Sequence, residues 1–90
     1  MTKMMKIDQA YPNPATEFIM LPVNSEIDLQ TDVNVVDISG RVVATHTMKI
    51  FKGYNRFNID TSELSDGVYF LSLEGLDIKE SNRRFVKISN

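Results

Sequence analysis

Few side chains in this sequence could carry out catalysis. His46 is the only histidine, and there is no cysteine. A Ser–His–Asp site needs a histidine base, so His46 is the one residue that could fill that role. It lies between Thr45 and Thr47 in a segment with the pattern of a strand, and we expect it to be an ordinary surface residue there. A single histidine without cysteine also argues against a transition-metal site.

Acidic residues are numerous, but only residues 60–67, Asp-Thr-Ser-Glu-Leu-Ser-Asp-Gly, concentrate them in one loop. Oxygen ligands on a tight loop can hold calcium. This stretch lacks the alternating acidic spacing and the terminal glutamate of an EF-hand, so it is interpreted as capping and turn residues. The four glycines are scattered, with no phosphate-binding G-x-G-x-x-G. We therefore expect no catalytic residue, no metal site and no cofactor.

Aromatic side chains near predicted loops offer a second kind of chemistry, because exposed rings can stack on sugars. Tyr11, Phe51 and Tyr54 are in such positions. Aromatic residues near strand ends more often cover a core, since burying them removes a large apolar area from water. Core contacts are the preferred interpretation, and sugar binding remains open.

Composition excludes several classes of function. The 90 residues carry a net charge of −2, without the basic surplus of a nucleic-acid binder. No apolar run approaches the roughly 20 residues of a membrane helix, so no stable membrane insertion is expected. The first six residues are basic but precede no apolar stretch, and they are not a signal peptide. We interpret residues 1–8 as a tail or linker remnant and residues 9–90 as one domain.

The elements that must position these side chains are strands. No window has the apolar stripe of a helix, whereas short β-branched and aromatic runs recur between turn residues. Pro12 and Pro14 predict a segment that crosses between strands. The pattern predicts an all-β, immunoglobulin-like antiparallel β-sandwich of about seven strands. Strands are expected near 6–10, 17–23, 32–38, 41–49, 55–60, 68–73 and 83–89, with a short edge strand around 26–29.

One hairpin has two possible registers. A two-residue loop would pair Asp37 with Val42. A longer turn that begins at Asp37, with its glycine in the left-handed conformation, would pair Asp37 with Arg41 and Val35 with Val43. We favour the second register, because it sets opposite charges against each other.

Two later segments have clear patterns. Residues 61–66 predict a single helical turn with Thr61 or Ser62 as its cap and Leu64 tucked inward. Residues 68–73 are apolar on both faces, which is typical of a central strand. In the last strand, Phe85 and Lys87 fall on one face and Val86 on the other.

Six blocks, in this order and spacing, strongly resemble the type A C-terminal sorting domain of the type IX (Por) secretion system of Bacteroidetes. The resemblance covers about residues 9–88. The blocks are YPNPAT at 11–16, VNVVDISGRVV at 33–43, GYN at 53–55, IDTSEL at 59–64, GVYFL at 67–71 and RFVKI at 84–88.

The resemblance implies a C-terminal sorting signal rather than an enzyme. It implies an N-terminally attached cargo that folds in the periplasm, is recognised by an outer-membrane translocon, and reaches the cell surface or the medium. A sortase-like cysteine protease commonly removes such a domain on its amino-terminal side. We expect this chain to be the tail of a longer protein, with any cleavage site in or before residues 1–10.

The resemblance also selects candidate residues. The terminal motif gives the candidates for translocon recognition, Arg84, Phe85, Val86, Lys87 and Ile88. The last strand is expected to offer a free edge to a partner sheet. Lys87 would contact the partner's charge or protect that edge from aggregation. The residues that match the fold signature are Tyr11, Pro12, Asn13, Pro14, Asp37, Gly40, Arg41, Gly67 and Tyr69.

A function of a different class remains as the alternative. The same fold would suit an accessory fibronectin-like or carbohydrate-binding module of a larger exported protein. A sorting signal should depend on its final strand, whereas a sugar-binding module should show a row of exposed aromatics. A small enzyme is disfavoured for lack of a base and of a cleft, because His46 is expected to be an ordinary surface residue and a sandwich of this size seldom builds a deep cleft.

Overall fold

The computed structural model describes residues 5–74 and 82–89. Strands follow one another along these residues, as the period-2 pattern predicts, and residues 8–17 form a longer connection between the first two. The strands are β1 (Met5–Ile7), β2 (Phe18–Ser25), β3 (Leu29–Asp37), β4 (Val42–Ile50), β5 (Gly53–Asp60), β6 (Gly67–Leu73) and β7 (Arg83–Lys87).

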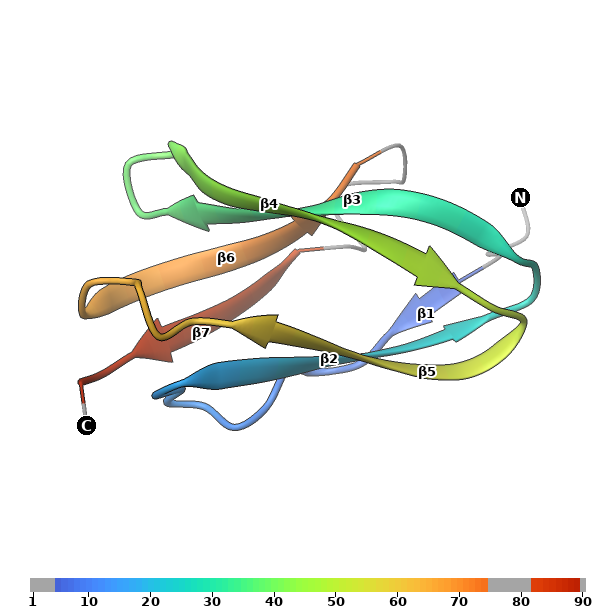
Figure 1. Ribbon diagram of the computed structural model, residues 1–90, viewed down its shortest axis with the longest axis horizontal. Helices are drawn as coiled ribbons and strands as arrows, with labels where there is room; N and C mark the ends of the chain where they lie inside the picture. The colour runs from blue at the N-terminus through green and yellow to red at the C-terminus, as the bar shows by residue number, and fades with distance from the viewer. Residues whose placement is uncertain (1–4, 75–81, 90) are drawn as a thin grey trace.

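The seven strands form two antiparallel sheets that pack face to face (Figure 1). One sheet has the order β1-β2-β5 and the other has the order β4-β3-β6-β7. These orders correspond to the A-B-E and C′-C-F-G sheets of an immunoglobulin-like sandwich. The described residues contain no helix. The predicted fold class is confirmed.

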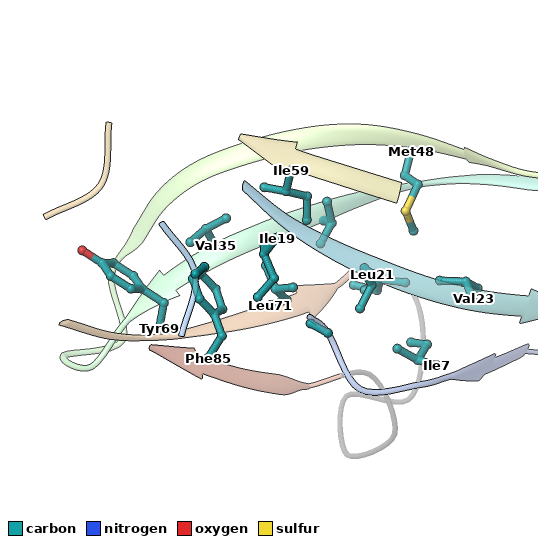
Figure 2. Close-up of a cluster of buried hydrophobic side chains, with 14 of the residues drawn as sticks. Ile7, Ile19, Leu21, Val23, Val35, Met48, Ile59, Tyr69, Leu71 and Phe85 are labelled. Carbon is teal, nitrogen blue, oxygen red and sulfur yellow. The ribbon is translucent and has the colours of Figure 1, made fainter. Parts of the chain in front are cut away.

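The core lies between the two sheets and is built from alternate residues of the strands (Figure 2). On β6, for example, Tyr69, Leu71 and Leu73 are buried, whereas Val68 and Phe70 on the opposite face are only half buried. β6 is therefore central within its sheet, as predicted, but only its inner face is covered completely. The largest fully buried side chains are Phe85, Ile19, Leu21, Met48, Ile50, Ile59, Leu71 and Leu73.

Tyr69, near the start of β6, makes a hydrogen bond that is typical of this fold. Its phenol donates to the carbonyl of Ser65, four residues upstream, at 2.6 Å. A tyrosine bonded back to the preceding corner is a recurrent feature of immunoglobulin-like sandwiches. The bond satisfies the polar end of a ring that is otherwise buried.

The expected edge strand and the first strand differ most from the sequence prediction. The edge strand expected around 26–29 does not form; Leu29 instead begins β3. The first strand ends at Ile7 rather than continuing to residue 10. Residues 5–7, taken from sequence as part of a tail, pair with Ser25, Asn24 and Val23 of β2, and Ile7 joins the core. Residues 1–4 of that tail lie outside the described part of the chain.

The hairpin between β3 and β4 adopts the favoured turn. The Asp37 amide donates to the Arg41 carbonyl at 2.8 Å, and the Gly40 amide donates to the Asp37 carbonyl at 3.0 Å. Gly40 has a φ of 92°, a conformation that glycine adopts without steric cost. The expected pairing of Val35 with Val43 is wrong, because a bulge shifts the register and pairs Val35 with Ala44.

The loop after β5 is a single hydrogen-bonded turn. The Leu64 amide donates to the Thr61 carbonyl at 3.0 Å, and the half-buried Leu64 side chain packs against the core. The cap differs from the prediction: Asp60, not Thr61 or Ser62, accepts the bond from the Ser62 amide, at 2.8 Å. Asp60 can do this because a short carboxylate reaches the amide two residues ahead.

Candidate recognition site around the last strand

β7 lies at one edge of the four-stranded sheet and separates the terminal motif into two sets of side chains. Phe85 and Lys87 face the core and are 0% and 5% exposed. Arg84 is exposed and Val86 is half buried on the outer face. This division follows from the alternation of side chains along a strand. Ile88, just beyond β7, is 42% exposed.

Phe85 is the motif's contribution to the core. Its ring stacks on Tyr69 of the neighbouring strand, with centroids 5.6 Å apart and the rings inclined by 23° (Figure 2). The two residues are also a directly opposed cross-strand pair. Such stacked pairs add stability beyond the apolar area that they bury.

Lys87 is a buried cation held by backbone oxygens. Its ammonium donates to the carbonyls of Thr16 and Thr61, the latter at 2.8 Å. Thr61 is fully buried, and its hydroxyl also donates to the Thr16 carbonyl, at 3.2 Å. Carbonyl oxygens compensate for the water that the buried ammonium has lost. Lys87 therefore joins the last strand to two distant parts of the chain, and the expected surface position of its charge is not observed.

The outer edge of β7 is not free, contrary to the prediction. The Val86 amide donates to the Asn13 side-chain oxygen at 3.0 Å, and the Ala15 amide donates to the Val86 carbonyl at 2.7 Å. The Ile88 amide then donates to the Ala15 carbonyl at 2.9 Å. The proline-containing segment 11–16 thus occupies the position of a neighbouring strand, and strand addition to this part of the edge would have to displace it.

Segment 11–16 is the crossing segment that its prolines predict. At its start, Tyr11 exchanges two backbone hydrogen bonds with Met20 of β2. At its end, Ala15 is bridged to Lys87 of β7. The chain therefore passes here from the three-stranded sheet to the edge of the four-stranded sheet.

Arg83 ties the beginning of β7 to the end of β1. Its guanidinium donates to the carbonyls of Ile7 and Asp8, the latter at 3.3 Å. Sequence reasoning did not single out Arg83, Ala15 or Thr61 as partners of the terminal motif. The sequence did hold a signal for the inward direction of Lys87, because Lys87 lies two residues after the apolar Phe85 and therefore on the same face of the strand.

The turn at Asp37 is organised by its carboxylate. Asp37 Oδ1 accepts bonds from the Ser39 amide, the Ser39 hydroxyl and the Arg41 amide, at 3.0, 2.6 and 3.0 Å. The Arg41 guanidinium lies 3.4 Å from Oδ2. The Ser39 hydroxyl, and after it the Arg41 amide, lower the pKa of Asp37, because these bonds favour its charged form.

The acidic loop 60–67 has the capping role inferred from sequence. The Ser62 hydroxyl and amide lower the pKa of Asp60. The Ser89 hydroxyl, which donates to Asp66 at 2.6 Å, lowers the pKa of Asp66. Among residues 5–74 and 82–89, no three His, Asp or Glu side chains are grouped as a metal would require.

His46 shows no arrangement for catalysis. It is half buried, and its Nε2 has no hydrogen-bond partner among the described residues. It faces inward opposite Val33, rather than outward as expected. A general base would need a hydrogen bond to the group that it activates.

The aromatics expected to cover the core are instead exposed. Phe51 and Tyr54 are each 61% exposed, and Tyr11 is 42% exposed. Phe18, at 41%, lies beside Asp60 at the edge of a shallow hollow. Five residues of β5 lie between Tyr54 and Asp60. The exposed rings are therefore spread along the three-stranded sheet and its corner. The hollow is lined by Glu17, Phe18, Asn58, Asp60 and Ser62.

Comparison with known families identifies the chain. Residues 9–88 match the family described as "Secretion system C-terminal sorting domain". The chain belongs to this family of type IX secretion sorting domains. The family is one of sorting signals and not a family of enzymes, and membership implies an attached N-terminal cargo, the type IX machinery, and export to the cell surface or the medium. A search of curated proteins gave no match.

For this sorting domain, the match includes both the crossing segment and the last strand, which bind each other in the structure. No helix in the described parts of the chain is long and apolar enough to cross a membrane.

Proposed function

We propose that this domain is the address by which an outer-membrane translocon recognises and exports a cargo attached ahead of residue 5. The cargo first enters the periplasm, and a sortase-like cysteine protease then removes the domain. The support is the combination of the family match over residues 9–88 with a terminal motif anchored at Phe85 and Lys87. The anchored residues hold the outward ones, Arg84 and Val86, in a fixed position.

The proposed processing cut lies before Met5. β1 is paired with β2, and Arg83 binds the carbonyls of Ile7 and Asp8. A cut after these residues would separate a strand that contributes to the core. Cleavage ahead of β1 removes the domain as one folded unit.

A fusion tests the sorting function. The 90 residues are placed behind a periplasm-targeted fluorescent protein in a bacterium that carries the type IX system. We expect fluorescence at the cell surface or in the medium, and fluorescence retained in the periplasm would contradict the proposal. A host without the translocon is the control.

The alternative function, a sugar-binding module, is not supported by the arrangement of the exposed aromatic side chains, because those of the described residues do not form one platform.

A further inference from the structure

One complete row of side chains crosses the outer face of the four-stranded sheet. The register pairs Val42 with Val36, Val36 with Phe70, and Phe70 with Arg84. Paired residues project to the same face, so three apolar side chains and one arginine lie side by side across four strands. Val42 is 51% exposed.

A second pair extends this row toward the end of the sheet. Val68 on β6 pairs with Val86 on β7, and both are half buried on the outer side. Beyond them, Ile38 in the β3–β4 turn and Ile88 after β7 are 76% and 42% exposed. The name "valine–phenylalanine face" is used below for Val36, Val42, Val68, Phe70 and Val86.

The valine–phenylalanine face has a sharp polar boundary. The next row along the same outer surface consists of Thr45, Asn34 and Ser72, and the Thr45 hydroxyl donates to Asn34 at 2.8 Å. The row after it pairs Asp32 with Thr47, which donates to its carboxylate at 3.0 Å. The apolar surface is thus confined to one end of the sheet, as at a protein contact site.

The position of the cargo leaves this end free. Met5, ahead of which the cargo is attached, pairs with Ser25, and Ser25 pairs with Gly53 at the β4–β5 corner. The β3–β4 turn and the end of β7, between which the valine–phenylalanine face lies, are at the opposite end of the molecule, beside the C-terminus (Figure 1). The molecule is 38 Å long, so a large external partner can reach this face without meeting the cargo.

The charges around the face disfavour a second copy as its occupant. Arg84 is exposed, and its guanidinium has no hydrogen bond or ion pair among the described residues. The two described carboxylates that flank this end of the sheet are already bound, Asp37 by Ser39 and Arg41, and Asp66 by Ser89. A symmetric contact between the faces of two copies would therefore leave Arg84 of each copy without an available carboxylate.

We propose that the valine–phenylalanine face and Arg84 form the surface by which the translocon recognises this domain, which rests on the sorting function proposed above. The partner is a translocon protein surface with apolar side chains and a carboxylate that meets Arg84. Within the terminal motif, Arg84 and Val86 then contact the partner, while Phe85 and Lys87 hold the strand in place. Arginine and aromatic side chains, here Arg84 and Phe70, are enriched at the centres of such interfaces.

The test compares matched variants in the fluorescent fusion. Arg84→Glu reverses the exposed charge, and Arg56→Glu makes the same change on an exposed residue of the other sheet. A Val68→Thr/Val86→Thr double variant keeps side-chain shape but removes apolar surface, and Phe18→Thr is its control. We expect Arg84→Glu and the double valine variant each to lower the exported fraction about tenfold, with both controls close to wild type.

Each outcome has a distinct meaning. Denaturation midpoints of the 90-residue chain show whether a variant still folds, and Arg84→Gln replaces Arg84→Glu if the latter does not. Normal export of folded face variants would overturn the recognition surface while leaving the sorting function intact. Failure of the wild-type fusion would overturn both. A wild-type dimer that Val68→Thr/Val86→Thr converts to a monomer would assign the face to a second copy and contradict the proposal.

Discussion

Lys87 shows how one side chain can fix three distant segments. Its ammonium reaches the carbonyls of Thr16, in the crossing segment, and Thr61, in the loop after β5. A buried amine is tolerated only where such acceptors surround it. Its role in the motif is therefore to hold the strand that carries the exposed residues.

Replacing Lys87 by Met should destabilise the domain by about 2 kcal/mol, because the carbonyls of Thr16 and Thr61 lose their hydrogen bonds to a charged donor and keep only those from the Thr61 hydroxyl and the Leu64 amide. Urea unfolding of the 90-residue chain measures the change. Lys49→Met on the exposed side of β4 is the control and should leave the midpoint nearly unchanged. Equal midpoints for the two variants would show that the buried bonds contribute little.

The hydrogen bonds to the Asp37 carboxylate predict how the stability of the domain changes at low pH. The pKa of Asp37 lies below the ordinary value of 3.8, chiefly because the Ser39 hydroxyl binds the charged form. Stability from such a group is fully present above the ordinary pKa and is lost as the pH falls through the lower, folded-state pKa. Asp37→Asn should lose less stability than wild type on going from about pH 6 to about pH 3. Denaturation midpoints at several pH values check this, and parallel pH curves would contradict it.

At the scale of elements, the crossing segment and β7 form a contact that sequence patterns do not reveal. Alternation predicted where most strands lie and that Phe85 and Lys87 share a face. The closed edge depends on Asn13 meeting Val86, which lies 73 residues away in the chain. Single-sequence patterns report local periodicity, so a pairing at this separation carries no local signal. The same reason explains the mistaken expectation of a free edge.

Removing the Asn13 side chain should loosen this edge locally. Asn13→Ala leaves the Val86 amide without its acceptor, and we expect amide exchange at Val86 to accelerate about fivefold, equivalent to roughly 1 kcal/mol. Hydrogen exchange followed by NMR measures each amide separately. Asn58→Ala, an exposed change on β5, should leave the Val86 rate unaltered. An unchanged rate in Asn13→Ala would mean that the side-chain bond does not protect the edge.

At the scale of the whole molecule, the sandwich was predictable because turn residues and period-2 runs recur along the chain. The bulge between Val35 and Val36 was not predictable, because a single extra residue in the partner strand leaves no mark in a period-2 pattern. The exposure of the aromatics was not predictable either, because it depends on how the two sheets pack. Because alternate residues of β7 face the core, this strand should also be necessary for the whole domain to fold. The last strand supplies Phe85 to the core, Lys87 to two carbonyls and Arg83 to the end of β1.

A chain that ends at Asn82 should therefore fail to fold, rather than fold without a recognition element. Truncating a buried phenylalanine alone costs about 3–5 kcal/mol, against a total stability of about 5–15 kcal/mol for a domain. Circular dichroism and protease sensitivity measure the loss, and a peptide of residues 83–90 added in trans should restore the fold by strand addition. The same peptide with Phe85→Ala should restore it poorly. A cooperative transition in the truncated chain without peptide would contradict this assignment.

Since truncation removes the fold and the outer residues together, a truncated fusion trapped in the periplasm cannot separate folding from recognition. Arg84→Glu in the intact domain can separate them.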